Sequence, residues 1–131
     1  MKFELGQTGA FEVEFDYGKL NISSNTVIGY RPVHLLVSSI AGCSGGLLKK
    51  VLEKKRIAFD TIHIDAEVER NEEEVNRVTK IALHYTVFGK DLNSAQVQKS
   101  LELAVKNCSM IESVKGAIEV VETVEVKESG A

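Results

Sequence analysis

The chain has 131 residues, of which 44% are hydrophobic and 27% are charged, and its formal net charge is −3 at pH 7. A chain of this length can build one hydrophobic core but not two, so we expect a single domain over residues 1–131. The slightly acidic balance and the lack of a basic cluster argue against a nucleic-acid partner. The N-terminal residues lack the apolar run of a signal peptide, which predicts a cytoplasmic protein.

The most apolar stretch of the chain covers residues 33–48 and contains His34, Ser38, Ser39 and Ser44. We expect it to be too short and too polar to cross a membrane, and we expect no membrane partner. Cysteines are normally kept as thiols in the cytosol, so a permanent disulfide between the two cysteines of the chain is not expected.

The first third of the chain reads as a β-hairpin. Apolar and acidic residues alternate from Phe11 to Asp16, which is typical of a half-exposed strand. A turn follows at residues 16–19, and Leu20 and Ile22 continue the alternation. Residues 10–23 are therefore predicted to form a hairpin.

A long helix is predicted from Pro32 to about Arg56. Proline is tolerated in the first turn of a helix because its missing N–H has no intrahelical partner there. One apolar stripe recurs at spacings of three and four residues. Its members are Val33, Leu36, Ile40, Cys43, Leu47 and Val51.

Cys43 lies on that stripe and is expected to face a core or an interface. Gly42, Gly45 and Gly46 flank it, and each glycine inside a helix costs about 1 kcal/mol relative to alanine. Three such residues around one thiol indicate a requirement for close packing or for access.

The rest of the chain alternates strands and helices. Strands are predicted over residues 62–69 and 81–87, separated by an acidic turn at residues 71–76. A helix capped by Asn93 or Ser94 should run to about Lys106, followed by a short helical segment at residues 110–114 and a last strand at residues 118–126. This order predicts an α+β domain. One long apolar helix in so small a chain predicts a homodimer that buries two such helices together.

Cys43 and Cys108 leave three interpretations open. Free cysteine behaves as a small hydrophobe, so both thiols could be structural. A metal site would need further ligands, and the chain has neither a Cys-x-x-Cys nor a His-x-x-x-His motif. The third interpretation is a redox pair, in which Cys43 attacks as a thiolate and Cys108 resolves the product.

An attacking Cys43 needs a cation or a hydrogen-bond donor beside it. It lies roughly 16 Å into its helix, too far from the N-terminus for that helix's own dipole. Arg31 and His34 lie about 13 Å or more from Cys43 along the same helix. We expect them either to reach Cys43 of a partner subunit or to be ordinary residues of the helix start. The apolar residues around Cys43 favour organic oxidants over hydrogen peroxide.

Residues 31–48, with their Ala-Gly-Cys segment, resemble the signature of the OsmC/Ohr family of osmotically inducible and organic hydroperoxide resistance proteins. The Lys106–Ser109 segment resembles the second-cysteine segment of that family. The resemblance implies an OsmC-like fold with an N-terminal hairpin, a long central helix, antiparallel strands, a second helix and a final strand, assembled as an intertwined homodimer.

The same resemblance implies a thiol peroxidase that acts on a small organic hydroperoxide in oxidative-stress defence. Cys43 would cleave the O–O bond, and Cys108 would then close a disulfide that an external dithiol reduces. No bound cofactor and no metal are implied.

Three positions depart from the family pattern. The family has a carboxylate near the start of the long helix, where this chain has Val33 and His34. Residues 1–30 contain no arginine, although studied members use one from the N-terminal strands, and Ser109 stands where proline is usual. The alternative is therefore an OsmC-fold protein that binds an apolar ligand or senses redox state, with weak or no peroxidase activity.

Overall fold

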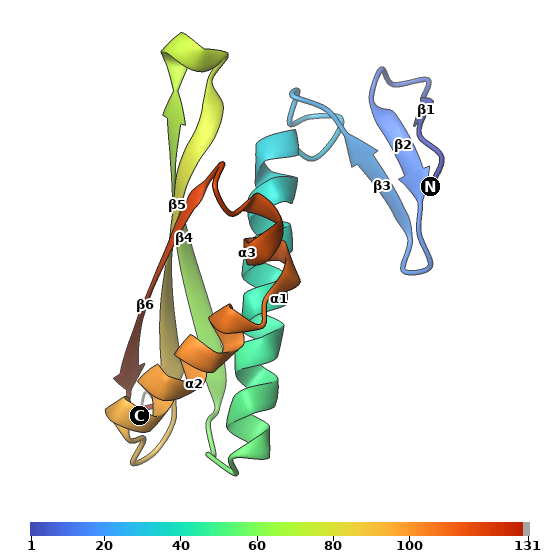
Figure 1. The fold of residues 1–131 in the computed structure, drawn as a ribbon. Coiled ribbons are helices and arrows are strands. Elements are labelled where there is room, and N and C mark those ends of the chain that lie inside the picture. Colours follow the sequence, from blue (N-terminus) through green and yellow to red (C-terminus); the bar gives the residue numbers. More distant parts are fainter. Residues whose placement is uncertain (130–131) are drawn as a thin grey trace. The chain divides into compact units, whose positions relative to one another are not determined.

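The structure is a computed structural model and describes residues 1–129 of the chain (Figure 1). The chain divides into two compact parts, residues 1–38 and the remainder from Ser39 onward. The single domain expected over residues 1–131 stays a prediction.

The first part holds a three-stranded antiparallel sheet in the order β1-β2-β3. Its strands are β1 (Glu4–Leu5), β2 (Phe11–Glu14) and β3 (Lys19–Ile22). The predicted hairpin is confirmed, and reciprocal backbone hydrogen bonds between Phe15 and Gly18 close its turn. Strand β1 was not predicted, because two residues are too few to show an alternation.

Helix α1 (Pro32–Lys54) begins at the proline, as predicted. Its fully buried residues are Ile40, Ser44, Leu48 and Leu52, which recur every four residues. Cys43 lies beside this row and is only half-buried. The predicted stripe is therefore correct at Ile40 and off by one position after it, because the helix is apolar on more than one face and its hydrophobic pattern does not fix its rotation.

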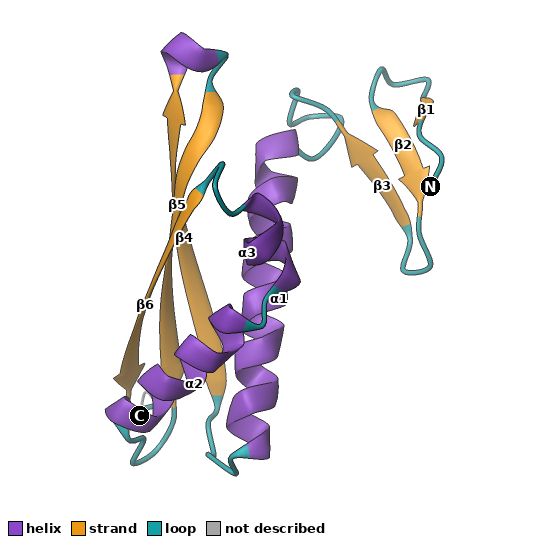
Figure 2. Cartoon of the chain, in the orientation of Figure 1, coloured by secondary structure: helices purple, strands orange, loops and turns teal. Residues whose placement is uncertain are grey.

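The second part holds the larger sheet, in the order β4-β5-β6. Its strands are β4 (Thr61–Asn71), β5 (Arg77–Phe88) and β6 (Glu119–Lys127). Strands β4 and β5 pair antiparallel, as predicted, whereas β5 and β6 pair parallel. Helices α2 (Ser94–Lys106) and α3 (Ser109–Val114) form the crossover between β5 and β6 and lie on the same face of the sheet as α1 from Ser39 onward (Figure 2).

The core lies between that sheet face and the helices. The inner face of β5 contributes Ile81, Leu83, Tyr85 and Val87, all essentially inaccessible to solvent. Helix α2 contributes Val97, Leu101 and Ala104. The side chain of Asn93 caps α2 by accepting a hydrogen bond from the backbone N–H of Gln96 at 3.0 Å, which confirms the predicted start of that helix.

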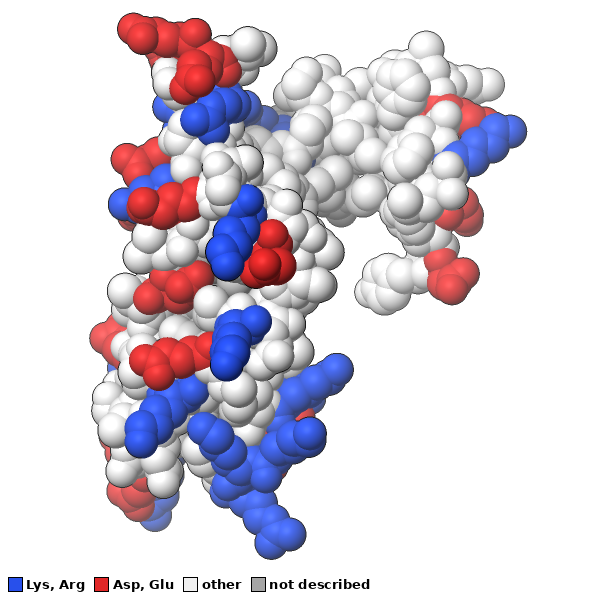
Figure 3. Space-filling model, in the orientation of Figure 1, with Lys and Arg blue, Asp and Glu red and all other residues white. Residues whose placement is uncertain are grey.

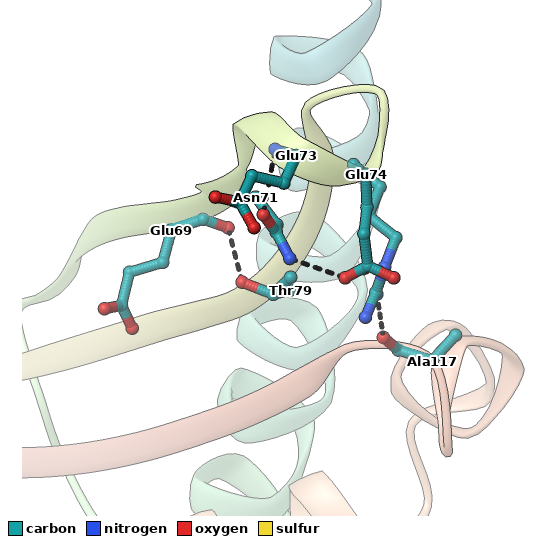
Figure 4. A network of polar contacts seen from close by, with 7 residues as sticks. Glu69, Asn71, Glu73, Glu74, Thr79 and Ala117 are labelled. Carbon is teal, nitrogen blue, oxygen red and sulfur yellow. Dashed lines mark hydrogen bonds and ion pairs between the residues drawn. The ribbon is translucent and has the colours of Figure 1, made fainter.

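A polar network closes the far end of the β4–β5 hairpin, where a 3₁₀ turn, η1 (Glu72–Glu74), joins the strands (Figure 4). The Asn71 carboxamide accepts from the backbone N–H of Glu73 at 3.0 Å, and the Thr79 hydroxyl donates to the carbonyl of Glu69 at 3.2 Å. Arg77 donates to the carbonyl of Ala117 at 3.0 Å, which ties the hairpin to the residues just before β6.

Charged side chains of both signs cover the second part, and each sign gathers at one end of it (Figure 3). Acidic side chains gather at the η1 turn, and basic side chains gather where α1 ends. Lysines near a helix C-terminus stabilise the exposed carbonyl ends of the helix.

Within residues 1–129, α1 is the one helix long and apolar enough to cross a membrane, judged by length and composition only. The expectation that this stretch is too short and too polar is therefore wrong. The core helix of a soluble protein meets the same criterion, and Ile40, Leu48 and Leu52 are buried within the chain. The finding is weak support for a membrane span.

Leu48→Ala should lower the free energy of unfolding by about 2–5 kcal/mol, because it leaves a cavity beneath a fully buried side chain. Leu103→Ala on α2 is the matched control, since Leu103 is 44% exposed, and it should cost far less. Urea titration followed by circular dichroism measures both. Equal losses would show that α1 does not pack in the core as described.

Candidate functional site

The two thiols come from segments far apart in the sequence. Cys43 lies in the middle of α1, and Cys108 is the residue just before the first turn of α3. Backbone hydrogen bonds fix Cys108 on both sides, from its N–H to the carbonyl of Val105 and from the N–H of Glu112 to its own carbonyl, both at 3.1 Å. Cys43 is half-buried and Cys108 is 1% exposed.

The structure brings these thiols into hydrogen-bond contact, and the contact lowers the pKa of Cys43. The largest cause is a hydrogen bond from the Cys108 thiol, which burial of Cys43 opposes. The backbone N–H of Met110 and both the hydroxyl and the backbone N–H of Ser109 lower this pKa further. Because these donors all favour the thiolate, Cys43 is the more acidic thiol of the pair.

Cys108 is shifted in the opposite direction. Burial raises its pKa, the backbone N–H groups of Ile111 and Met110 lower it, and the hydrogen bond to Cys43 raises it again. Loss of a proton is therefore favoured at the half-exposed Cys43 over the buried Cys108.

The donors beside Cys43 differ from those expected. A cation from Arg31 or His34 was anticipated, but the groups that lower the Cys43 pKa are the Cys108 thiol and the first turn of α3. Arg31 is half-buried and His34 exposed at the start of α1, in the first compact part. Their roles stay predictions. Ser109 was noted only as a departure from the family pattern, although its hydroxyl reaches Cys43.

A second buried contact lies next to the thiols and was not predicted. Ser44 follows Cys43 in α1, is inaccessible to solvent, and its Oγ lies 2.6 Å from the Tyr85 hydroxyl on β5. Burial raises the pKa of Tyr85 to about 12, although the hydrogen bond with Ser44 opposes the shift. Negative charge on Glu122 or Cys108 also raises it, so the phenol lies close to the thiol site.

The glycines around Cys43 serve different purposes. A Cβ on Gly45 would lie 2.7 Å from Cδ1 of Ile64, so Gly45 allows α1 to approach β4 closely. A Cβ on Gly42 or Gly46 would meet nothing within 4 Å. Both residues line an open groove of about 440 Å³ between α1 and β4. Close packing thus explains Gly45, whereas Gly42 and Gly46 lie on the wall of the open groove.

The metal interpretation requires a cluster of ligand side chains. Within the described residues, 1–129, no group of three or more His, Cys, Asp or Glu side chains is arranged to hold a metal ion. The two thiols are both free in this structure.

A fold with a long helix on a three-stranded sheet and a thiol pair between helices defines a known class. Residues 23–123 match the family of OsmC-like proteins, and the chain belongs to that family. The match includes α1 and both cysteines. The family includes peroxidases.

Particular relatives are similar over most of their length. Protein YhfA of Escherichia coli K12 is 30% identical over 96 residues, which cover 72% of this chain and 72% of that protein. A hypothetical protein from Aquifex aeolicus has a crystal structure that superposes with a TM-score of 0.88 at 25% identity, covering 98% of this chain and 96% of that one. The organic hydroperoxide resistance protein OsmC from Legionella pneumophila gives 0.71 at 20% identity, covering 95% and 94%.

The rate of Cys43 alkylation by iodoacetamide should show a midpoint below the ordinary thiol pKa, because the donors around Cys43 stabilise its thiolate. Cys108→Ala should raise that midpoint the most, and Ser109→Ala should raise it less. Peptide mass spectrometry across a pH series measures the rates.

Ser113→Ala is the control for Ser109→Ala, because the Ser113 hydroxyl bonds the carbonyl of Ser109 and is not among the groups that shift the Cys43 pKa. It should leave the midpoint unchanged. A Cys43 midpoint equal to that of free cysteine would contradict the assigned hydrogen bonds.

Proposed function

We propose that this protein is a cytoplasmic thiol-dependent peroxidase that reduces small organic hydroperoxides through Cys43 and Cys108. The observation that carries the proposal is the unequal pair of thiols, in which hydrogen-bond donors lower the pKa of the half-exposed Cys43 and burial raises the pKa of Cys108. The likeness to the organic hydroperoxide resistance protein of Legionella pneumophila supports the same chemistry.

In the first step the Cys43 thiolate attacks one oxygen of the O–O bond. That bond breaks, the sulfur is oxidised to a sulfenic acid, and the other oxygen leaves as an alkoxide that takes a proton to become an alcohol. The donors around Cys43 lower its pKa, so a larger fraction of the thiol is ionised and ready to attack at neutral pH.

In the second step Cys108 attacks the Cys43 sulfenic sulfur. The S–O bond breaks, water leaves, and a Cys43–Cys108 disulfide forms. An external dithiol then reduces this disulfide by thiol–disulfide exchange and is itself oxidised. Because the thiols are already in contact when reduced, closure requires little movement of either helix.

The neighbours of Cys43 along α1 favour organic substrates. Leu47 lies one turn after it and is half-buried, whereas Ile40, one turn before it, is fully buried in the core. An apolar hydroperoxide gains binding free energy from such contacts, whereas hydrogen peroxide gains little.

We further propose that the active form is an intertwined homodimer. The most apolar window of α1 is only 22% buried within one chain, and the groove beside Gly42 and Gly46 is open. Family members are typically dimers. In such an assembly Arg31 and His34 of one subunit are the candidates to approach Cys43 of the other.

Cys43→Ser should abolish turnover of cumene hydroperoxide with a dithiol reductant. Cys108→Ser should support one round and then accumulate sulfenic acid or higher oxidation states on Cys43, because nothing nearby resolves them. Mass spectrometry after stoichiometric oxidation reads the state of each cysteine.

Oxidation that begins on Cys108, or wild type that forms no Cys43–Cys108 disulfide, would overturn these roles. Thiols that react no faster than free cysteine would favour the alternative, an OsmC-fold protein that binds an apolar ligand or senses redox state.

Gly46→Arg should convert the dimer into a monomer, because a long charged side chain would fill the open groove without touching the chain's own atoms near the Cβ. Glu102→Arg, an exposed position on α2, is the control. Light scattering should give about twice the 14.4 kDa chain mass for wild type and control. A monomeric wild type would exclude the dimer.

A further inference from the structure

The hydrogen bond between Ser44 and Tyr85 has a fixed direction. The Ser44 hydroxyl lies 2.9 Å from the carbonyl of Ile40 and 3.3 Å from that of Ala41, and a carbonyl can only accept. The single hydroxyl proton of Ser44 is therefore directed to its own helix. With that proton directed to the helix carbonyl, Tyr85 supplies the proton of the 2.6 Å contact and Ser44 accepts it.

This direction does not change under physiological conditions. Burial raises the pKa of Tyr85 to about 12, and negative charge on Glu122 or Cys108 acts in the same sense. The phenol therefore keeps its proton at neutral pH and remains a donor. A phenol in an otherwise apolar face of β5 thus has one buried partner at a defined point of α1.

Helix α1 needs such a contact because its apolar residues do not set its rotation. Two neighbouring rows could each face the sheet, one containing Cys43, Leu47 and Val51 and the other containing Ser44 and Leu48. Successive residues of a helix are about 100° apart around its axis. Turning α1 by one residue would bury Cys43 and carry Ser44 away from Tyr85.

We propose that Tyr85 is a positioning residue: its hydrogen bond to Ser44 selects the rotation of α1 that leaves Cys43 accessible and facing Cys108. Hydrophobic burial is non-directional, whereas a buried polar group that loses its partner is penalised, so this bond favours the observed rotation, as does the close approach of Gly45 to Ile64. The inference deepens the proposed peroxidase function and rests on it for its biological role.

The test measures the thiol pair without any hydroperoxide. Tyr85→Phe keeps the ring in the core and removes only the hydroxyl, and Ser44 keeps its bond to Ile40. In mixtures of reduced and oxidised dithiothreitol, the equilibrium between the Cys43–Cys108 disulfide and the dithiol should shift about three- to tenfold toward the reduced protein. The ionisation midpoint of Cys43, followed by thiolate absorbance, should rise as its contact with Cys108 loosens.

Two further variants separate positioning from loss of stability. Ile81 lies on the same face of β5, and Ile81→Val shortens this core side chain without touching the Ser44–Tyr85 bond. It should leave the disulfide equilibrium within about twofold of wild type and the Cys43 midpoint unchanged. If Tyr85→Phe folds poorly, Ser44→Ala/Tyr85→Phe removes both polar partners at little cost in stability and should give the same shifts.

The inference is overturned if Tyr85→Phe, or the double variant in its place, matches wild type in both measurements. Equal shifts in Ile81→Val, or a wild type that forms no disulfide with oxidised dithiothreitol, would overturn it too. A wild type that forms the disulfide but does not turn over cumene hydroperoxide would defeat the peroxidase proposal alone.

Discussion

The contact between one row of α1 and the inner face of β5 determines where every other part of the site lies. Ile40, Ser44 and Leu48 of this row are fully buried, Ser44 contacts Tyr85 of β5, and Cys43 lies beside the row on the helix. Most of the free energy comes from apolar burial, which stabilises the layer but tolerates small rotations. The buried hydrogen bond between Ser44 and Tyr85 favours one rotation of α1 on the sheet.

Around Cys43, neutral hydrogen-bond donors stand where the family pattern would supply charged side chains. Backbone N–H groups and a hydroxyl near the start of α3 stabilise the Cys43 thiolate without a permanent cation. In a partly dry site such neutral donors are effective because little water competes with them. This arrangement lowers the pKa of Cys43 in a chain without arginine in residues 1–30.

The sequence predicted those elements whose signals are local. Alternation located the hairpin and strands β4 and β5, Pro32 marked the start of α1, and Asn93 marked the start of α2. The expected roles of the two cysteines came from the resemblance to the family. None of these signals specifies how a helix is rotated on a sheet, so Cys43 was placed on the buried stripe and Ser44 was treated as an interruption.

Local sequence patterns also could not predict which distant segments pair with one another. The parallel pairing of β6 with β5 depends on the crossover through α2 and α3, and the donors of α3 meet Cys43 only once that crossover has formed. Neither the β5–β6 pairing nor the contact between α3 and Cys43 produces a periodic pattern in the sequence. Arg31 and His34 were chosen as activators because no closer donor could be recognised from sequence spacing.

The position of Cys108 within that crossover has a further effect. A disulfide to Cys43 would close a covalent loop around residues 44–107, which hold β4, β5 and α2. By the chain-entropy model, closing a loop of this length stabilises the folded chain by about 4 kcal/mol, a large share of the stability of a small domain. The oxidised protein would resist unfolding and proteolysis more than the reduced one, so each turn of the redox cycle would also alternate the chain between a tighter and a looser folded state.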